Sequence, residues 1–228
     1  MYLITDNKYK INIWWSAKCA CTYIKNMYYV VILGYDIEDV HINESYTAKY
    51  VKNNYKNVYV CRNPYARIVS SYVHRLELYD KYESFEDFIN LIYQQYVKCN
   101  TIIDEKDFIH HTTPQFSELY PLDESFKLDS ITKMEDLYKT NLLKEWFNIT
   151  TDIKLKDNFG YNTNVQRNNY IVKNAFKLAK KDIIEMKKEN NVPYYTSFYN
   201  EEIKNKVNEI YNVDFKILEY YNIIYKLE

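Results

Sequence analysis

The alternation of apolar and polar residues near the N-terminus predicts a strand followed by a helix. Residues 9–15, Tyr-Lys-Ile-Asn-Ile-Trp-Trp, are rich in β-branched and aromatic side chains and predict a strand. Small and polar residues follow, and Thr22 is a favourable N-cap for the next segment. Residues 23–33 place apolar side chains at helical spacing, and Gly34 stands where a helix is expected to end. This stretch therefore predicts a strand, a turn and a helix in succession.

A second unit of the same kind follows. Val-Tyr-Val-Cys at residues 58–61 predicts a strand, and Asn63 followed by Pro64 predicts the start of a helix that runs to about residue 79. Residues 39–42, between the two units, predict a short additional strand. Strands that alternate with helices at this spacing favour a central parallel sheet with helices on both faces, which places the chain in the α/β class.

The remainder of the chain predicts further helices, one strand and one long loop. Ser84 with Asp87 predicts the start of an amphipathic helix whose apolar face includes Phe85, Phe88 and Ile92. The other predicted elements are a strand at residues 126–131, helices at residues 134–147, 170–188 and 200–211, and a polar loop at residues 157–169. No repeat or low-complexity linker interrupts the chain, so we expect a single domain over residues 1–228.

Composition and charge exclude several classes of function. The chain has 30 Lys and Arg residues against 31 Asp and Glu residues, so its net charge of −1 gives no overall field that would attract nucleic acid or an anionic membrane. With only two glycines, neither the dinucleotide motif G-x-G-x-x-G nor the nucleoside-triphosphate motif G-x-x-x-x-G-K-[ST] occurs. The N-terminus lacks the apolar core of a signal peptide, and no apolar stretch of about 18 residues is present. We therefore expect a cytoplasmic protein without a transmembrane segment.

The turn between the first strand and its helix, at residues 16–22, has the chemistry of an anion site. Backbone N–H groups and the positive end of the helix dipole converge at such a turn. Lys18 supplies an ammonium group inside the turn, while Thr22 and Lys25 supply a hydroxyl and a second charge one helical turn apart. The alternative interpretation is an ordinary strand-to-helix connection with a solvated lysine, and this segment alone leaves both open.

The second strand-to-helix turn adds two arginines. Arg62 ends the predicted strand, and arginine is suited to bidentate recognition of a phosphate. One face of the following helix presents Arg67, Ser70, Ser71 and His74. The alternative interpretation is a basic helix face exposed to solvent. Two anion-binding turns in one α/β unit indicate a single ligand with two anionic ends.

Both turns resemble the donor-binding motifs of the Golgi carbohydrate sulfotransferases. Residues 17–25, A-K-C-A-C-T-Y-I-K, resemble the family's 5′-phosphosulfate loop, P-K-V-A-C-T-x-W-K. Residues 62–72, R-N-P-Y-A-R-I-V-S-S-Y, resemble its 3′-phosphate motif, R-[DE]-P-x-x-R-L-V-S-x-Y. Shorter similarities follow in the family's order at residues 111–115, 129–135 and 211–215. Together these motifs extend over most of the chain.

The resemblance implies a single α/β domain that moves a sulfuryl group from 3′-phosphoadenosine 5′-phosphosulfate (PAPS) to a hydroxyl group of a carbohydrate, without a metal. Lys18 would be the catalytic cation that neutralises the leaving phosphate. The residues that match the family's donor site are Ala20, Cys21, Thr22 and Lys25 at the 5′-phosphosulfate, and Arg62 and Ser70 at the 3′-phosphate. Arg67 joins this donor site from its place on the same helix face as Ser70. The expected partners are PAPS and a glycan acceptor.

The acceptor hydroxyl needs a general base, for which the chain offers four histidines: His41, His74, His110 and His111. We predict that His41 is the base. A strand at residues 39–42 in the same sheet would bring His41 to the carboxyl ends of the strands, where α/β sheets bind ligands. His111 and Arg167 are expected on the acceptor side instead.

Two other classes of function remain open at this point. The first is a non-catalytic nucleotide-binding module that keeps both anion turns but lacks the base. The second is a P-loop-type kinase, which is disfavoured because no glycine-rich loop ending in Lys-[Ser/Thr] occurs and no carboxylates for Mg²⁺ can be identified beside the turns. The motifs carry no readable code for the identity of the acceptor.

Overall fold

The structure is a computed structural model of the 228-residue chain. It describes residues 1–34, 54–100, 103–117, 119, 126–137, 145–147 and 170–227. The chain divides into two compact units: unit 1 comprises Met1–Arg62 and Glu118–Thr163, and unit 2 comprises Asn63–Ser117 and Asn164–Glu228. The single domain expected from the sequence stays a prediction.

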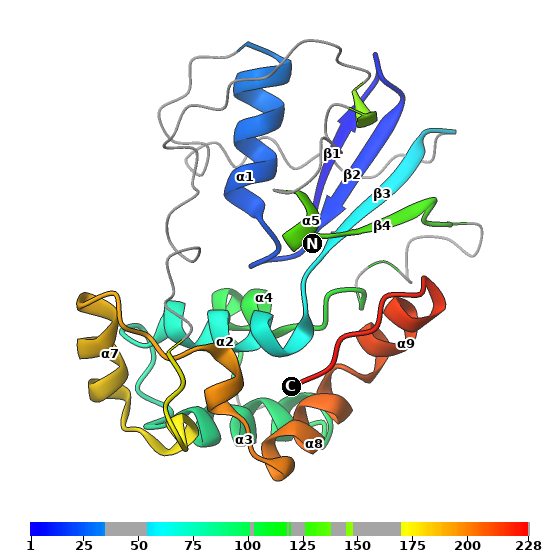
Figure 1. Ribbon diagram of the computed structural model, residues 1–228. Helices are drawn as coiled ribbons and strands as arrows, with labels where there is room; N and C mark the ends of the chain where they lie inside the picture. Colours follow the sequence, from blue (N-terminus) through cyan, green and yellow to red (C-terminus); the bar gives the residue numbers. More distant parts are fainter. Residues whose placement is uncertain are drawn as a thin grey trace. The chain divides into compact units, whose positions relative to one another are not determined.

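Unit 1 contains a four-stranded mixed sheet in the order β1-β2-β3-β4 (Figure 1). The strands are β1 (Tyr2–Asp6), β2 (Ile11–Trp15), β3 (Lys56–Cys61) and β4 (Ser130–Lys133). Strands β2, β3 and β4 are parallel to one another, and β1 is antiparallel to β2. Helices accompany the sheet, so the α/β class predicted from the sequence is confirmed.

Strand β1 was not predicted, and it makes the sheet mixed because it pairs with β2 in the antiparallel direction. A tight turn joins β1 to β2, and in it Lys10 has a left-handed φ of 52°. The backbone N–H of Tyr9 donates to Oδ1 of Asp6 at 2.8 Å, which stabilises the turn from within. This hairpin escaped prediction because its turn contains no glycine and no Asn-Gly or Asp-Gly pair.

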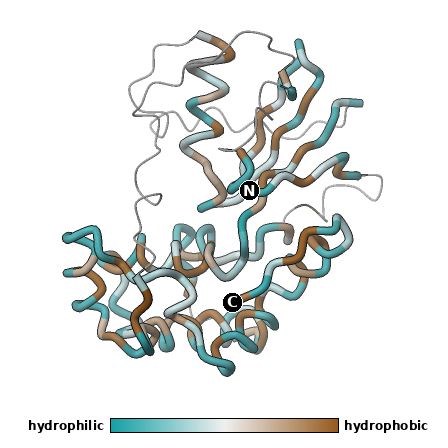
Figure 2. The backbone as a smooth tube through the Cα atoms, viewed as in Figure 1, coloured by the Kyte–Doolittle hydropathy of each residue, from teal (hydrophilic) through white to brown (hydrophobic). Residues whose placement is uncertain are grey.

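The helix that follows β2 packs its apolar face against the sheet. It consists of α1 (Cys21–Asn26) and the π-helix η1 (Met27–Ile32), and it ends beside Gly34, whose φ of 70° is left-handed as a helix stop requires. Alternate residues of a strand point to the same face of a sheet. The resulting core includes Ile13, Trp15, Val58 and Val60 from the sheet and Ile24 and Met27 from the helix. Figure 2 shows how hydrophobic and hydrophilic residues are distributed along these strands.

The later elements of unit 1 differ from the sequence prediction at their boundaries. Strand β4 begins at Ser130 rather than at residue 126. Helix α5 (Met134–Leu137) fits the start of the predicted helix at residues 134–147, and part of that range lies outside the described residues. The predicted strand at residues 39–42 and the predicted loop at residues 157–169 also lie outside them.

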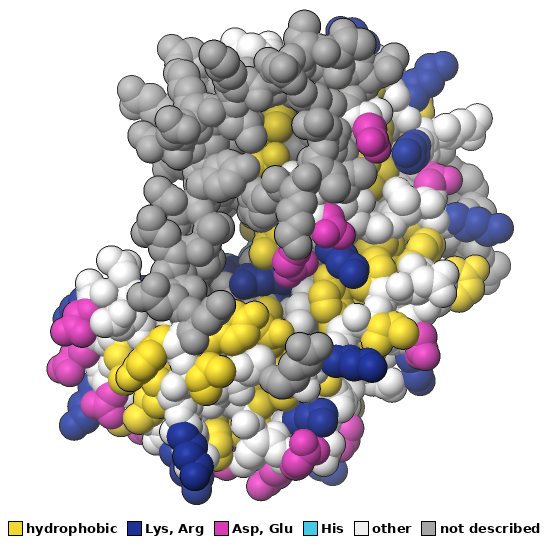
Figure 3. All heavy atoms as spheres, in the orientation of Figure 1, with side chains coloured by type: hydrophobic (Ala, Val, Ile, Leu, Met, Phe, Trp, Pro, Cys, Tyr) yellow, Lys and Arg dark blue, Asp and Glu magenta, His cyan; other side chains and the backbone are white. Residues whose placement is uncertain are grey.

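Unit 2 is built from helices. They are α2 (Pro64–Arg75), α3 (Phe85–Tyr96), α4 (Lys106–Thr112), α7 (Lys180–Lys188), α8 (Glu201–Ile210) and α9 (Asn212–Tyr220), with the 3-10 turns η3 (Ala175–Lys177) and η4 (Tyr195–Phe198). Four aromatic side chains meet in its core: Tyr72, Phe85, Phe88 and Phe198. The ring centroids of the three phenylalanines lie 5.2 to 6.1 Å from the ring centroid of Tyr72. Figure 3 shows charged side chains around the visible rim of this unit, with hydrophobic side chains gathered between them.

The predicted helix starts in unit 2 are confirmed by their caps. Oδ1 of Asn63 accepts a hydrogen bond from the backbone N–H of Tyr65 at 3.0 Å, and Pro64 opens α2 as predicted. Oγ of Ser84 accepts from the backbone N–H of Asp87 at 3.2 Å at the start of α3. Helix α2 ends at Arg75, earlier than the predicted residue 79.

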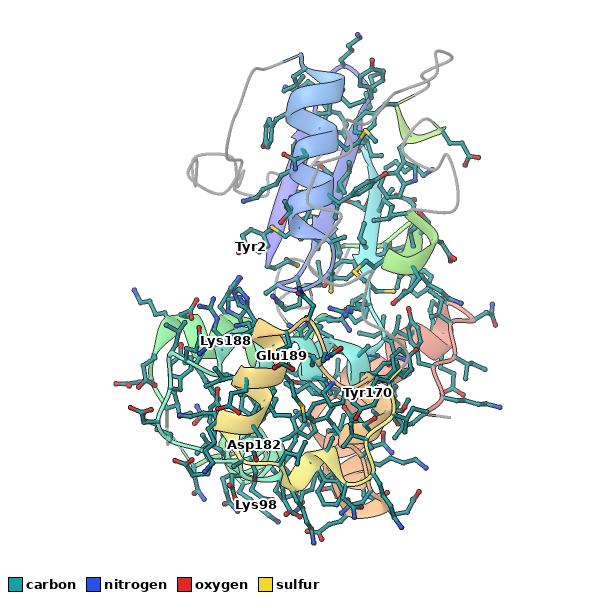
Figure 4. The ribbon with its side chains drawn as sticks, turned by 60° about the vertical axis from the view of Figure 1, so that its left-hand side comes forward. Tyr2, Lys98, Tyr170, Asp182, Lys188 and Glu189 are labelled. Carbon is teal, nitrogen blue, oxygen red and sulfur yellow. The ribbon has the colours of Figure 1, made fainter. Side chains whose placement is uncertain are left out.

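The prediction of one helix over residues 170–188 is wrong in its first half. Only η3 and α7 are helical there, and Asn174 has a left-handed φ of 59° that a continuous helix cannot contain. Figure 4 labels Tyr170 at the start of this segment and Asp182 and Lys188 on α7. The prediction at residues 200–211 is confirmed by α8.

Candidate functional site

The turn between β2 and α1 is left-handed at two residues that are not glycine. Lys18 has a φ of 66°, and Ala20 has a φ of 61° with a ψ of 29°. The backbone N–H of Cys19 donates to the carbonyl oxygen of Ser16 at 3.2 Å, which closes the turn. Left-handed conformations of this kind are costly for residues with a Cβ and concentrate at functional sites. They also aim backbone N–H groups into a concavity that suits an anion.

The start of α1 differs from the prediction. Ala20, rather than Thr22, occupies the N-cap position, and Thr22 lies inside the first turn of the helix. An alanine has no side-chain oxygen with which to cap the helix, so this end depends on other acceptors. The sequence predicted Thr22 as the N-cap because threonine is a favourable capping residue. The left-handed conformation of Ala20 was not predicted, because glycine is the residue that usually marks such a conformation.

Three cationic side chains converge on this turn within unit 1. Nη1 of Arg62, at the end of β3, donates to the carbonyl oxygen of Lys18 at 3.2 Å. Burial raises the pKa of the Cys21 thiol, while the ammonium groups of Lys25 and Lys18 act in the opposite direction. The ammonium of Lys25 also lies 5.2 Å from the ring centroid of Tyr2, labelled in Figure 4. A protein with almost no net charge thus concentrates positive charge at one turn.

Helix α2 in unit 2 uses its two adjacent serines differently. Oγ of Ser71 donates to the carbonyl oxygen of His111 at 2.8 Å and joins α2 to the end of α4. The Ser70 hydroxyl makes no hydrogen bond with the part of the chain that the structure describes. Arg67, Ser70 and Ser71 are each at most 2% exposed. The alternative of a solvent-exposed basic face is therefore wrong for these three residues, and it holds only for His74.

Arg67 acts electrostatically on a buried carboxyl group in the same unit. Asp214 on α9 is 0% exposed and accepts hydrogen bonds from the backbone N–H groups of Gln115 at 2.8 Å and Phe116 at 3.0 Å. Burial raises the pKa of Asp214 to about 6, and the guanidinium of Arg67 is the largest opposing influence. The hydroxyl of Tyr211 donates to the carbonyl oxygen of Thr112 at 2.7 Å. The short motifs at residues 111–115 and 211–215 therefore contact each other.

His111 lies among groups that engage both of its ring nitrogens. Nδ1 lies 2.8 Å from the carbonyl oxygen of Asp107, and because a carbonyl only accepts, we assign the proton of the neutral ring to Nδ1. Nε2 is then an acceptor, and Nη2 of Arg75 lies 3.0 Å from it. Burial lowers the pKa of His111 to about 4. The ring is therefore neutral near pH 7 with its lone pair engaged, which does not suit a general base.

The remaining histidines and the predicted acceptor-side arginine are placed only in part. The rings of His74 and His110 lie beside His111, with centroids 5.8 and 5.1 Å from it. His41 and Arg167 lie outside the described residues. Among the residues that the structure does describe, no group of His, Cys, Asp and Glu side chains could hold a metal ion.

Sequence reasoning missed the partners of Asp214. Gln115 and Asp214 are 99 residues apart in the chain, so no spacing rule connects them. The only signal was the order of the two short motifs that contain them.

As for a membrane span, none of the helices in the described ranges is both long and apolar enough to form one.

The structure thus shows an α/β protein with a mixed sheet and a left-handed turn that has cationic side chains beside it. A family model described as "Sulfotransferase family" matches residues 1–221. The chain therefore belongs to the sulfotransferase family, in which PAPS is the standard donor. No curated protein and no solved structure gives a significant match to the chain.

Proposed function

We propose that this protein transfers a sulfuryl group from PAPS to a hydroxyl group of a carbohydrate acceptor. Membership of the sulfotransferase family supports sulfuryl transfer in general. The observation that carries the donor assignment is the contact between Arg62 and the left-handed turn at Lys18. It joins a phosphate-type turn to an arginine within one unit, as a ligand with two anionic ends requires.

The residues proposed to bind the donor fit its chemistry. The turn offers backbone N–H groups and ammonium groups to a phosphosulfate, and Ser70 offers a hydroxyl that no described residue engages. The proposed ligands are Ala20, Cys21, Thr22 and Lys25 for the 5′-phosphosulfate and Arg62 and Ser70 for the 3′-phosphate. Arg67, on the same helix face as Ser70, is a further proposed donor-binding residue. PAPS would supply an activated sulfuryl group and leave as 3′,5′-adenosine bisphosphate.

Lys18 is the proposed catalytic cation. Negative charge grows on the oxygen between sulfur and phosphorus as their bond breaks, and a cation placed there lowers the barrier. Lys18 belongs to the turn itself, and its ammonium acts on Cys21 at the start of α1. Its backbone is held by Arg62, so the side chain is anchored at a defined point.

His41 is the proposed general base that takes the proton of the acceptor hydroxyl. The engaged nitrogens and the low pKa of His111 favour His41 over His111 for this role. His111 and Arg167 stay predictions for the acceptor side. The choice of a carbohydrate as acceptor rests on the resemblance of both donor motifs to the carbohydrate sulfotransferases.

Two measurements test this proposal. The first compares thermal stabilisation of the protein by 3′,5′-adenosine bisphosphate and by ATP with Mg²⁺, because a ligand at about 100 times its Kd stabilises by about 2.7 kcal/mol. We expect the bisphosphate to stabilise far better, and the reverse order would favour the kinase alternative. The second measures transfer of labelled sulfate from PAPS to saccharides, a tyrosine peptide and simple alcohols.

The transfer assay has a matched control. Lys18→Ala removes the proposed catalytic cation, whereas Lys56→Ala removes an exposed lysine of the same unit outside the turn. Saccharide sulfation that depends on Lys18 and not on Lys56 supports the proposal. Tight bisphosphate binding with no transfer to any acceptor would favour the non-catalytic module.

A further inference from the structure

We propose that Ser16 and Tyr59 are positioning residues, and that the hydrogen bond between their hydroxyl groups holds the turn after β2 in the shape that receives the 5′-phosphosulfate of the donor. This inference rests on the proposed function, because the turn has this ligand only if the protein binds PAPS. Both residues lie outside the motif segments at residues 17–25 and 62–72.

The turn has to be held because its backbone conformation is unfavourable. Lys18 and Ala20 are left-handed, with φ of 66° and 61°, although each carries a Cβ atom. Such conformations persist only where the surrounding structure imposes them. The shape of the turn therefore depends on contacts that fix it to the rest of unit 1.

A buried hydrogen bond fixes the first residue of the turn. Oγ of Ser16 lies 2.7 Å from the hydroxyl oxygen of Tyr59, and one of these hydroxyl groups donates to the other. Ser16 is 6% exposed and Tyr59 is 0% exposed, so the bond is shielded from competing water. The carbonyl oxygen of Ser16 also accepts the backbone N–H of Cys19 at 3.2 Å. Ser16 thus closes the turn with its backbone and joins it to β3 with its side chain.

Tyr59 is a rigid point to which the turn can be fixed. It lies on β3, opposite Trp14 of β2 on one side and Ile131 of β4 on the other. Pairing with two strands restricts its backbone, and complete burial of its ring restricts its side chain. The Tyr59 hydroxyl therefore holds Ser16 at a defined place relative to the sheet.

The rival role for Ser16 is direct binding of the phosphosulfate. In that role the Tyr59 hydroxyl would contribute to the stability of unit 1 and not to recognition of the donor. The short distance between the two hydroxyl oxygens favours the positioning role, because it engages the Ser16 hydroxyl with β3. The two roles predict different results when only the Tyr59 hydroxyl is removed.

The test compares Ser16→Ala, Tyr59→Phe and the double variant of the 228-residue chain. Each single substitution removes one oxygen atom and keeps the rest of the side chain. The readout is the 5′-phosphate selectivity, defined as the Kd for adenosine 3′-phosphate divided by the Kd for 3′,5′-adenosine bisphosphate, together with the Tm. This ratio reports on the turn, because both nucleotides carry the same adenosine and the same 3′-phosphate.

If the pair positions the turn, each single variant loses about tenfold in selectivity, because ångström-scale misplacement of a binding group is enough to impair recognition. The double variant then stays within about threefold of either single variant, since the same hydrogen bond is lost in all three. Losses that multiply in the double variant would overturn the inference. A loss confined to Ser16→Ala would also overturn it and would assign direct binding to Ser16.

Tyr28→Phe is the matched control. The Tyr28 hydroxyl also makes a buried hydrogen bond in unit 1, donating to Oδ2 of Asp6 at 2.8 Å, and both residues lie outside the turn. We expect this variant to melt at a lower temperature and to keep its selectivity within about threefold of wild type. Equal losses of selectivity in Tyr28→Phe and Tyr59→Phe would show that selectivity follows stability, which would overturn the inference.

The wild-type protein separates this inference from the proposed function. Wild type that prefers the bisphosphate, together with variants that keep this preference, would overturn only the role of Ser16 and Tyr59. Wild type that binds both nucleotides equally, or neither of them, would instead refute the proposed function.

Discussion

Removal of one hydroxyl group from the aromatic core of unit 2 should stabilise the protein. Tyr72 on α2 is 0% exposed, and its hydroxyl has no hydrogen-bond partner among the described residues. Burial raises the pKa of this phenol, as expected for a polar group without compensation. The substitution Tyr72→Phe removes the hydroxyl and leaves the ring in contact with Phe85 and Phe88.

The expected magnitude follows from the burial of the hydroxyl. A buried hydroxyl without a partner costs about 1–3 kcal/mol by mutational data. Some of this gain is offset by the packing contacts that the oxygen atom makes, so we expect Tyr72→Phe to raise the free energy of unfolding by about 1–2 kcal/mol. For a chain of this length, that corresponds to a rise in Tm of about 2–8 °C.

A neighbouring tyrosine provides the matched control with the opposite sign. The ring of Tyr82 lies 5.7 Å from that of Tyr72, and its hydroxyl donates to the carbonyl oxygen of Arg75 at 3.2 Å. Tyr82→Phe breaks this hydrogen bond and should destabilise by about 1 kcal/mol. Chemical denaturation of the three proteins measures both changes. Equal destabilisation by the two substitutions would refute the reasoning from the Tyr72 hydroxyl.

Three further predictions concern the site and its surroundings. Lys18→Ala should slow sulfuryl transfer by about 10²-fold or more while the protein still binds 3′,5′-adenosine bisphosphate, and near-normal turnover would remove Lys18 from the mechanism. Arg62→Ala should weaken binding of the bisphosphate more than Ser70→Ala, with little change for 5′-AMP in either variant; equal losses for both nucleotides would show that these residues act elsewhere. The low pKa of His111, about 4 against an ordinary 6.5, contributes stability that is present above pH 6.5 and lost as the pH falls towards 4. The raised pKa of Asp214 gives the free energy of unfolding the opposite dependence on pH. The test is therefore the difference in the free energy of unfolding between wild type and His111→Gln. This difference should shrink between pH 7 and pH 4.5.

Local chemistry explains which elements the sequence predicted correctly. The starts of α2 and α3 depend on Asn63, Pro64 and Ser84, whose effects reach only two or three residues along the chain. The core faces of these helices follow from helical periodicity alone, as Ile68 and Phe88 illustrate with exposures of 0% and 1%. Strand β1 was missed because its turn lacks the glycine-containing pairs that mark tight hairpins, although Asp6 stabilises the turn with its side chain. Lys10 adopts a left-handed conformation that is uncommon for residues other than glycine.

The candidate site likewise combines features that could be predicted from the sequence with features that could not. The sequence by itself determined which residues stand at the strand-to-helix turns, because strands, small residues and caps are read over a few neighbouring positions. Only the tertiary structure decided that Lys18 and Ala20 are left-handed, that Arg62 reaches the Lys18 carbonyl, and that Asp214 receives partners from about 100 residues away. Such contacts depend on which segments pack together, and packing is settled by the burial of the whole chain rather than by any local pattern.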